Sequence, residues 1–190
     1  MISENLIQEV SHFVYNDLRK YQVLPESQFT VAIDKGEWLA VKFEANVNIV
    51  RLGTLLMDSM LSLAVKKNIP GEHIKMSEDK AKEILSKFPE VNEEERQNIL
   101  HCVKEHHGVD DFYSLESEIC CNADCYKFIS IKGVAEGMHE KNMPLSDLVS
   151  LYKQKADEKW GALSLDICKE ELEQQYKVIK EFFSYYPLEK

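Results

Sequence analysis

An adjacent histidine pair and a downstream aspartate are the residues of this sequence best suited to chemistry. His106 and His107 stand at the end of one helical pattern, and Asp124 lies within the next. On a helix, the side chains three and four positions from Asp124 are mostly apolar. A carboxylate in such surroundings needs hydrogen bonds, a cation or a metal ion as its partner. Because two imidazoles lie one loop upstream, we expect a metal ion.

Two residues earlier in the chain extend this set. Asp58 lies at the edge of the apolar arc of segment 47–66, and His73 stands just before a helix, where an imidazole can point into a cavity. Histidine and carboxylate side chains bind divalent metals, and a bridging carboxylate brings two ions close enough for joint catalysis. The candidate metal ligands are therefore Asp58, His73, His106, His107 and Asp124.

Most of these candidates also have a purely structural explanation. Asp58 would pair with Arg51, two turns earlier on the same segment. His73 would face the solvent at the start of its helix. One residue of the pair His106 and His107 would bond a backbone carbonyl in the core, and the other would lie at the surface.

The composition is that of a globular protein with one domain, residues 1–190. The chain is 44% hydrophobic and 29% charged, and its length allows a substantial core. The formal net charge of −10 argues against nucleic acid or an anionic membrane as a partner. A small anionic ligand is compatible with this charge, because a metal ion inverts the local field.

The sequence predicts a cytoplasmic protein without disulfides. No apolar run reaches the length of a membrane span, and the start, MISENLIQEV, lacks the order of a signal peptide. The five cysteines are an odd number in a chain without that signal. Their helical spacing, without a CxxC knuckle, favours buried small hydrophobes. A zinc or redox role is the alternative for Cys102, Cys120, Cys121 and Cys125.

Apolar spacing predicts a fold that is almost entirely helical. Residues 2–21 carry an apolar stripe at the helical period, and segment 47–66 is apolar around most of its circumference, which is typical of a central helix. Further helices are expected over 77–87, with Ser77 as its N-cap, and after Asn92. The last helices are expected at 145–158 and 165–185, after a helix that bears Asp124 and a mobile connection that contains Gly133 and Gly137.

One segment has two interpretations. QFTVAI and EWLAVKF flank Asp34-Lys35-Gly36, and this pattern is typical of a short β-hairpin at residues 28–43. The alternative is that Trp38–Glu44 begins the next helix. In either case we expect an all-α fold in a single compact domain, with at most one hairpin.

The order and spacing of the candidate ligands resemble those of the HD superfamily of metal-dependent phosphohydrolases. Leu55-Leu56-Met57-Asp58 is similar to the family's Leu-Leu-His-Asp, and His73 is similar to the histidine that starts the next helix. His106 and His107 match its paired histidines, and Asn122-Ala123-Asp124 resembles its final segment. The resemblance covers residues 47–130.

This resemblance implies a fold, an activity and a cofactor. It implies a helical domain in which Asp58 and the other candidate ligands hold one or two divalent ions, either iron, manganese, magnesium or zinc. It also implies hydrolysis of a nucleotide or another small-molecule phosphoester. Candidates for neutralising the phosphate are Lys75, Lys80 and Lys104.

Two departures from the family pattern favour a second hypothesis. Met57 offers a soft thioether where the family has a histidine ligand, and a thioether is a poor partner for hard ions. His12 is the only upstream histidine, and it projects opposite the apolar stripe of its helix. Asn46 or Asn48 would then stand where the family pattern has its first histidine. The alternative is therefore a degenerate HD-like domain that binds a ligand, a metal or a protein without catalysis.

Overall fold

The computed structural model describes residues 2–140 and 143–186. Over these residues the chain is helical and contains no strand, which confirms the expected all-α class. The helices are α1 (Glu4–Tyr21), α2 (Glu26–Lys42), α3 (Val47–Leu56), α4 (Leu61–Lys66), α5 (His73–Leu85), α6 (Glu93–Glu105), α7 (Leu115–Ile129), α8 (Ile131–Glu140), α9 (Leu145–Ala162) and α10 (Asp166–Ser184), with a 3₁₀ turn at Pro70–Glu72.

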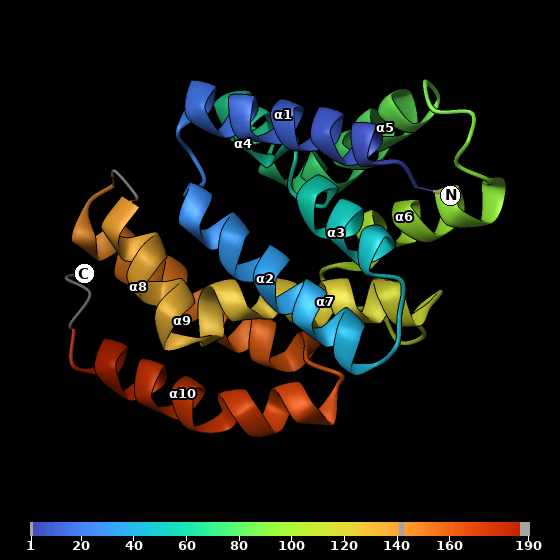
Figure 1. The fold of residues 1–190 in the computed structure, drawn as a ribbon. Coiled ribbons are helices and arrows are strands. Elements are labelled where there is room, and N and C mark those ends of the chain that lie inside the picture. Colours follow the sequence, from blue (N-terminus) through green and yellow to red (C-terminus); the bar gives the residue numbers. More distant parts are fainter. Residues whose placement is uncertain (1, 141–142, 187–190) are drawn as a thin grey trace.

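The helices pack around α7 as one compact domain. In Figure 1, α1 lies along one edge of the molecule, α10 lies along the opposite edge, and α7 runs between them behind α2. Helix α7 contacts α2, α3, α6, α8, α9 and α10. Its residues are buried without interruption from Ile119 to Lys127. This burial explains why a charged residue on α7 must find its partners inside the protein.

The apolar segment 47–66 forms two helices rather than one. Helix α3 ends at Leu56, and a turn at residues 57–60 leads into α4. By length and composition alone, Val47–Lys66 is long and apolar enough to span a membrane. The expectation that no apolar run reaches that length is therefore wrong. Most of this segment is buried inside the protein. Its hydrophobicity therefore reflects a place in the core.

The predicted β-hairpin at 28–43 is wrong, because this segment is the continuous helix α2. Gly36 does not mark a turn. A Cβ atom at this position would lie 3.0 Å from Val50 Cγ1 and 3.0 Å from Thr54 Cγ2 on α3. The glycine therefore allows α2 to pack closely against α3, and this tertiary packing outweighs the local preference for a turn.

The glycines at 133 and 137 also lie in a helix, α8, so the expected mobile connection is wrong. A Cβ at Gly137 would collide with the side chains of Tyr152 and Gln28. Gln28 bonds to the Tyr152 hydroxyl and to the carbonyls of Lys127 and Gly133. These contacts join α2, α7, α8 and α9, so the small residues permit close packing here.

Ser77 is not the N-cap of its helix. Helix α5 begins four residues earlier, at His73, and Ser77 lies buried within it. The Ser77 hydroxyl accepts a hydrogen bond from the backbone N–H of Met60 at 3.1 Å. This bond holds the turn after α3 against α5. The other predicted cap is confirmed, because Asn92 and Glu95 form a capping box at the start of α6.

All five cysteines are free and buried, as expected for small core residues. Burial raises the pKa of the Cys102 and Cys125 thiols, and it raises the pKa of Cys168 to about 11. These shifts disfavour the thiolate that metal binding and redox chemistry require. The packing therefore supports a structural role for these residues.

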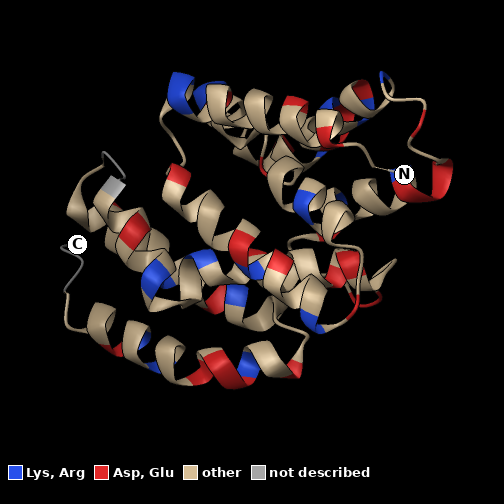
Figure 2. Cartoon of the chain, in the orientation of Figure 1, with Lys and Arg blue, Asp and Glu red and all other residues tan. Residues whose placement is uncertain are grey.

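Charged residues of both signs are spread over the helices, as Figure 2 shows most clearly along α10. Most of these side chains are exposed or partly exposed. Lys127 on α7 and Lys159 on α9 are exceptions, because only 4% and 1% of their surface is exposed. Buried lysines are rare unless they are paired, and their partners are two aspartates of the candidate site.

We predict that Gly53→Ala destabilises the protein, because Gly53 lies where α3, α6 and α7 meet. Its added Cβ would lie 2.5 Å from Cys102 Cβ and 2.7 Å from Cys120 Sγ. Urea unfolding should show a loss of about 1–3 kcal/mol, the usual cost of overpacking a core.

Gly161→Ala on α9 is the matched control, because nothing lies within 4 Å of its added Cβ. It should leave the free energy of unfolding unchanged or raise it by up to about 1 kcal/mol. Equal stability of the two variants would contradict the close packing at Gly53.

Candidate functional site

His73 and His106 are held in one tautomer by backbone carbonyls. The Nδ1 atom of His73 lies 2.8 Å from the Pro70 oxygen, and that of His106 lies 2.7 Å from the Val103 oxygen. Because a carbonyl only accepts, each Nδ1 carries the proton and donates. Both Nε2 atoms are buried without a hydrogen-bond partner. Metal-binding histidines are commonly oriented by this kind of backbone bond.

The side chain of His107 completes a group of three imidazoles. One ring nitrogen from each of His73, His106 and His107 lies within 4.8 Å of the other two. Burial, assisted by His106 and Lys159, lowers the pKa of His107 to about 3. Burial also lowers the pKa of His73. Both rings are therefore neutral near pH 7 and keep a lone pair that can bind a metal ion.

Asp58 faces these histidines with one oxygen. Its Oδ1 lies 3.5 Å from Nε2 of both His73 and His106. Burial alone would raise the pKa of Asp58, but the charge of Lys127 and contacts with both histidines hold it well below its usual range. An ionised carboxylate and the unpartnered Nε2 atoms of His73 and His106 thus face one another. Such a donor set fits a divalent first-row metal ion.

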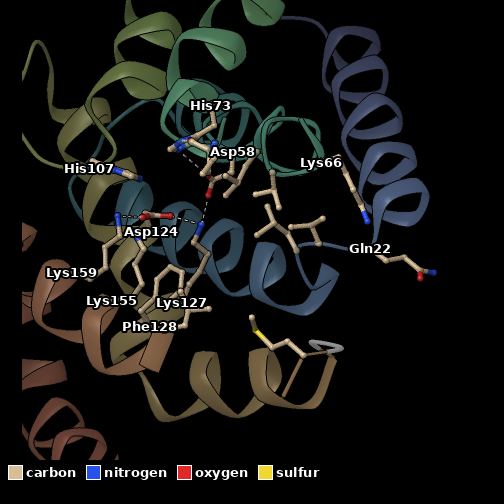
Figure 3. Close-up of a pocket in the computed structure, with 17 residues that line it drawn as sticks. Gln22, Asp58, Lys66, His73, His107, Asp124, Lys127, Phe128, Lys155 and Lys159 are labelled. Atoms are coloured by element: carbon tan, nitrogen blue, oxygen red, sulfur yellow. Dashed lines mark hydrogen bonds and ion pairs between the residues drawn. The ribbon is translucent and has the colours of Figure 1, made fainter. Parts of the chain in front are cut away.

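The second oxygen of Asp58 belongs to a buried chain of charges. Lys127 Nζ lies 2.5 Å from Asp58 Oδ2 and 2.5 Å from Asp124 Oδ1. Lys159 Nζ lies 2.6 Å from Asp124 Oδ2. Figure 3 shows the Lys127 ammonium between the two carboxylates, with Lys159 on the far side of Asp124. We call these four residues the charge chain.

Each member of the charge chain fixes the charge of its neighbours. Burial would lower the pKa of Lys127, but Asp124 and Asp58 outweigh it and raise that pKa above its usual value. Burial would likewise raise the pKa of Asp124, but Lys127 and Lys159 lower it. All four groups are therefore ionised near pH 7. Two carboxylates and two ammonium groups sum to zero charge.

The structure brings all five sequence-predicted ligands to one region. The pairing of Asp58 with Arg51 is wrong, because Arg51 bonds to Glu37 instead. His73 is 7% exposed and does not face the solvent. Asp124 as a metal ligand stays a prediction, since an ammonium group contacts each of its oxygens.

Other residues considered from the sequence lie elsewhere. His12 is exposed and bonds to Asn16, and Asn46 caps α3. Lys75 and Lys80 pair with acidic residues of α5. Neither these residues nor Lys104 lines the pocket, so none of the three lysines is placed to neutralise a phosphate bound there.

The lysines that do line the pocket were missed from the sequence. One signal was present, since Lys127 lies three residues after Asp124 on the same apolar helical face. No sequence pattern links Lys155 and Lys159 on α9 to this site. They reach it only through the packing of α9 against α7.

Four of the five candidate ligands, all except the fully buried His106, line a pocket with a charged floor and an apolar wall. Its volume is about 500 Å³. His73, His107 and the charge chain form the floor, while Gln22 and Lys66 lie at the rim in Figure 3. The apolar wall consists of Val23, Leu24, Leu61, Val65, Phe128, Met143 and Leu151.

Solved structures share this fold. The chain is similar to a predicted HD superfamily hydrolase from an uncultured Thermotogales bacterium, with a TM-score of 0.67, 14% identity, and 94% of this chain and 90% of that chain covered. A Lactobacillus plantarum protein gives a TM-score of 0.71 at 15% identity, with 98% and 97% covered. Bacillus subtilis YpgQ gives 0.61 at 13%, with 95% and 92% covered. The expected HD-type fold is therefore confirmed.

The comparisons of sequence, unlike those of structure, give no match for this chain. No family model matches it, and no curated protein matches it significantly. At these identities, the resemblance to the solved structures establishes the arrangement of helices alone.

We predict that Lys159→Met destabilises the protein far more than Lys180→Met. Each lysine contacts one aspartate closely, but the Lys159–Asp124 pair is buried, whereas the Lys180–Asp157 pair is exposed. Urea unfolding should show a loss of about 3 kcal/mol for Lys159→Met, the low end for a broken buried pair, because Lys127 still faces Asp124.

The surface variant serves as the control. Lys180→Met should change the free energy of unfolding by less than about 1 kcal/mol. Similar losses for both variants would mean that burial does not strengthen the charge chain.

Proposed function

We propose that this protein is a metal-dependent phosphohydrolase that acts on a small phosphoester. One observation carries the proposal: the Nε2 atoms of His73 and His106 each lie 3.5 Å from Asp58 Oδ1 in a buried space and have no hydrogen-bond partner. A cation held among these three atoms would stabilise the buried carboxylate oxygen. The HD-type fold, shared with a structure described as a predicted hydrolase, supports this proposal.

The metal ion would be held by His73, His106, His107 and Asp58. Three imidazoles and a carboxylate suit manganese, iron or zinc better than magnesium, which prefers oxygen ligands. A divalent ion bound there lowers the pKa of a coordinated water and neutralises charge on a phosphoryl group. The neutral state of His107, favoured by its low pKa, keeps its ring nitrogen available for this ion.

The pocket's own side chains would bind the phosphate. Lys155 and Lys66 add positive charge beside the neutral charge chain, although Lys155 also contacts Glu158. A pocket lined by lysines in a protein of net charge −10 attracts an anion through its local field. Lys155 can reach a bound phosphate without leaving a buried carboxylate unpaired.

The wall of the pocket indicates the chemistry of the rest of the substrate. Seven apolar residues border the space above the charged floor. They bury apolar groups well and offer no partners for sugar hydroxyls. We therefore propose a phosphomonoester with an apolar organic group, and we rank nucleotides below it.

A second candidate function is the binding of an anionic ligand without catalysis. Two observations favour it: Lys127 fills the space between two carboxylates, and Met57 is buried where the resembled family has a histidine. In that case the pocket would hold an anion through its lysines, and the histidines would stay free of metal.

Metal content separates the two functions. We predict about one manganese, iron or zinc ion per purified wild-type chain, measured by elemental analysis, and phosphatase activity that depends on it. His106→Ala should lose both, because it removes a buried ligand.

The control is His101→Ala on the same helix. His101 stacks on Tyr113 and contacts Glu105, away from the pocket. This variant should keep the ion. A wild-type protein that binds inorganic phosphate, carries no metal and hydrolyses no phosphoester would favour the binding function instead.

The apolar wall yields a prediction about substrate preference. We predict that kcat/KM is about tenfold higher for hexyl phosphate than for ethyl phosphate, as burial of two or so methylenes at about 0.8 kcal/mol each would give. Leu151→Asp in the wall should abolish this difference. Val178→Asp on the exposed part of α10 should preserve it. Equal kcat/KM values for the two esters with wild-type protein would rule out an apolar subsite.

A further inference from the structure

We infer that the Lys127 ammonium group is a built-in cation that takes the place of a second metal ion, so that the site holds one divalent ion at most. Lys127 would then be a positioning residue that holds Asp58 and Asp124 together. The presence of one ion at Asp58 and the histidines rests on the proposed function. The absence of a second ion beside Lys127 can be tested separately.

The position of the ammonium group supports this inference. Lys127 Nζ contacts one oxygen each of Asp58 and Asp124, at 2.5 Å in both cases. These aspartates come from different elements, the turn after α3 and the middle of α7. A cation between two carboxylates from separate elements is the arrangement of a bridging metal ion. Here a lysine from α7 itself supplies that charge.

The balance of charge disfavours another ion in this place. The charge chain is neutral as it stands, with two carboxylates against two ammonium groups. All four residues are at most 5% exposed. A divalent ion added between Asp58 and Asp124 would leave two uncompensated positive charges among largely buried groups, at a high cost in free energy.

The remaining donors divide into two sets. Asp58 Oδ1 and the three histidines lie on one side, where Oδ1 faces Nε2 of His73 and Nε2 of His106. Asp58 Oδ2 and Asp124 lie on the other side and are occupied by lysines. Met57, next to Asp58, is 1% exposed and offers only a thioether. The structure therefore provides ligands for one ion.

The experiment is a Mn²⁺ titration followed by calorimetry and elemental analysis. Wild type should bind one ion per chain. Lys127→Met removes the ammonium group and leaves two facing carboxylates, so it should bind one ion more than wild type. Mn²⁺ should also raise the melting temperature of this variant more than that of wild type, a readout that needs no activity.

Lys155→Met is the matched control. This residue lines the same pocket but pairs with Glu158, so its loss should leave the number of bound ions unchanged. If Lys127→Met does not fold, Asp124→Asn decides instead. It should keep the single ion, because Asp124 contacts lysines only. Loss of that ion would overturn the inference.

The outcomes distinguish the inference from the proposed function. Two ions in wild type, or no additional ion in Lys127→Met, would overturn the inference. No ion in wild type but one in Lys127→Met would support the inference and contradict the metal-dependent function. No ion in either protein would contradict both.

Discussion

The alternating contact of Asp58, Lys127, Asp124 and Lys159 is the constraint on which the rest of the site depends. It joins the turn after α3 to α7 and α9, three elements far apart in the sequence. Each charge is buried and would be costly alone. Together they fix the orientation of Asp58, whose free oxygen faces the histidines, and they define the floor of the pocket.

Most helices, and the fact that the candidate ligands lie close together, could be predicted from the sequence, because both leave local signals. The apolar periods of α1 and α6, the cap at Asn92 and the order of aspartates and histidines are properties of neighbouring residues. Two of the errors share a physical cause. Gly36 was expected in a turn and Gly137 in a mobile connection, whereas both are places where a side chain on another helix needs the space. Such contacts are not visible in local sequence.

The same limit applies to the site. The sequence indicated that Asp124 needs a partner, and a metal ion was expected because two histidines were close in the chain. Its partners are instead Lys127, one turn away, and Lys159, which only tertiary packing brings near. The order along the chain indicated which histidines of α5 and α6 lie together, but not the cations of α7 and α9.

The neutrality of the charge chain affects how stable the protein would be without a metal ion. Many small metalloproteins unfold when their ion is removed, because the free energy of metal binding supplies much of their folding free energy. Here the most costly carboxylates are already compensated by the chain itself. Under the proposed metal-dependent function, metal supply would therefore control how many molecules carry an ion while leaving the amount of folded protein unchanged, and the binding of the ion would be reversible.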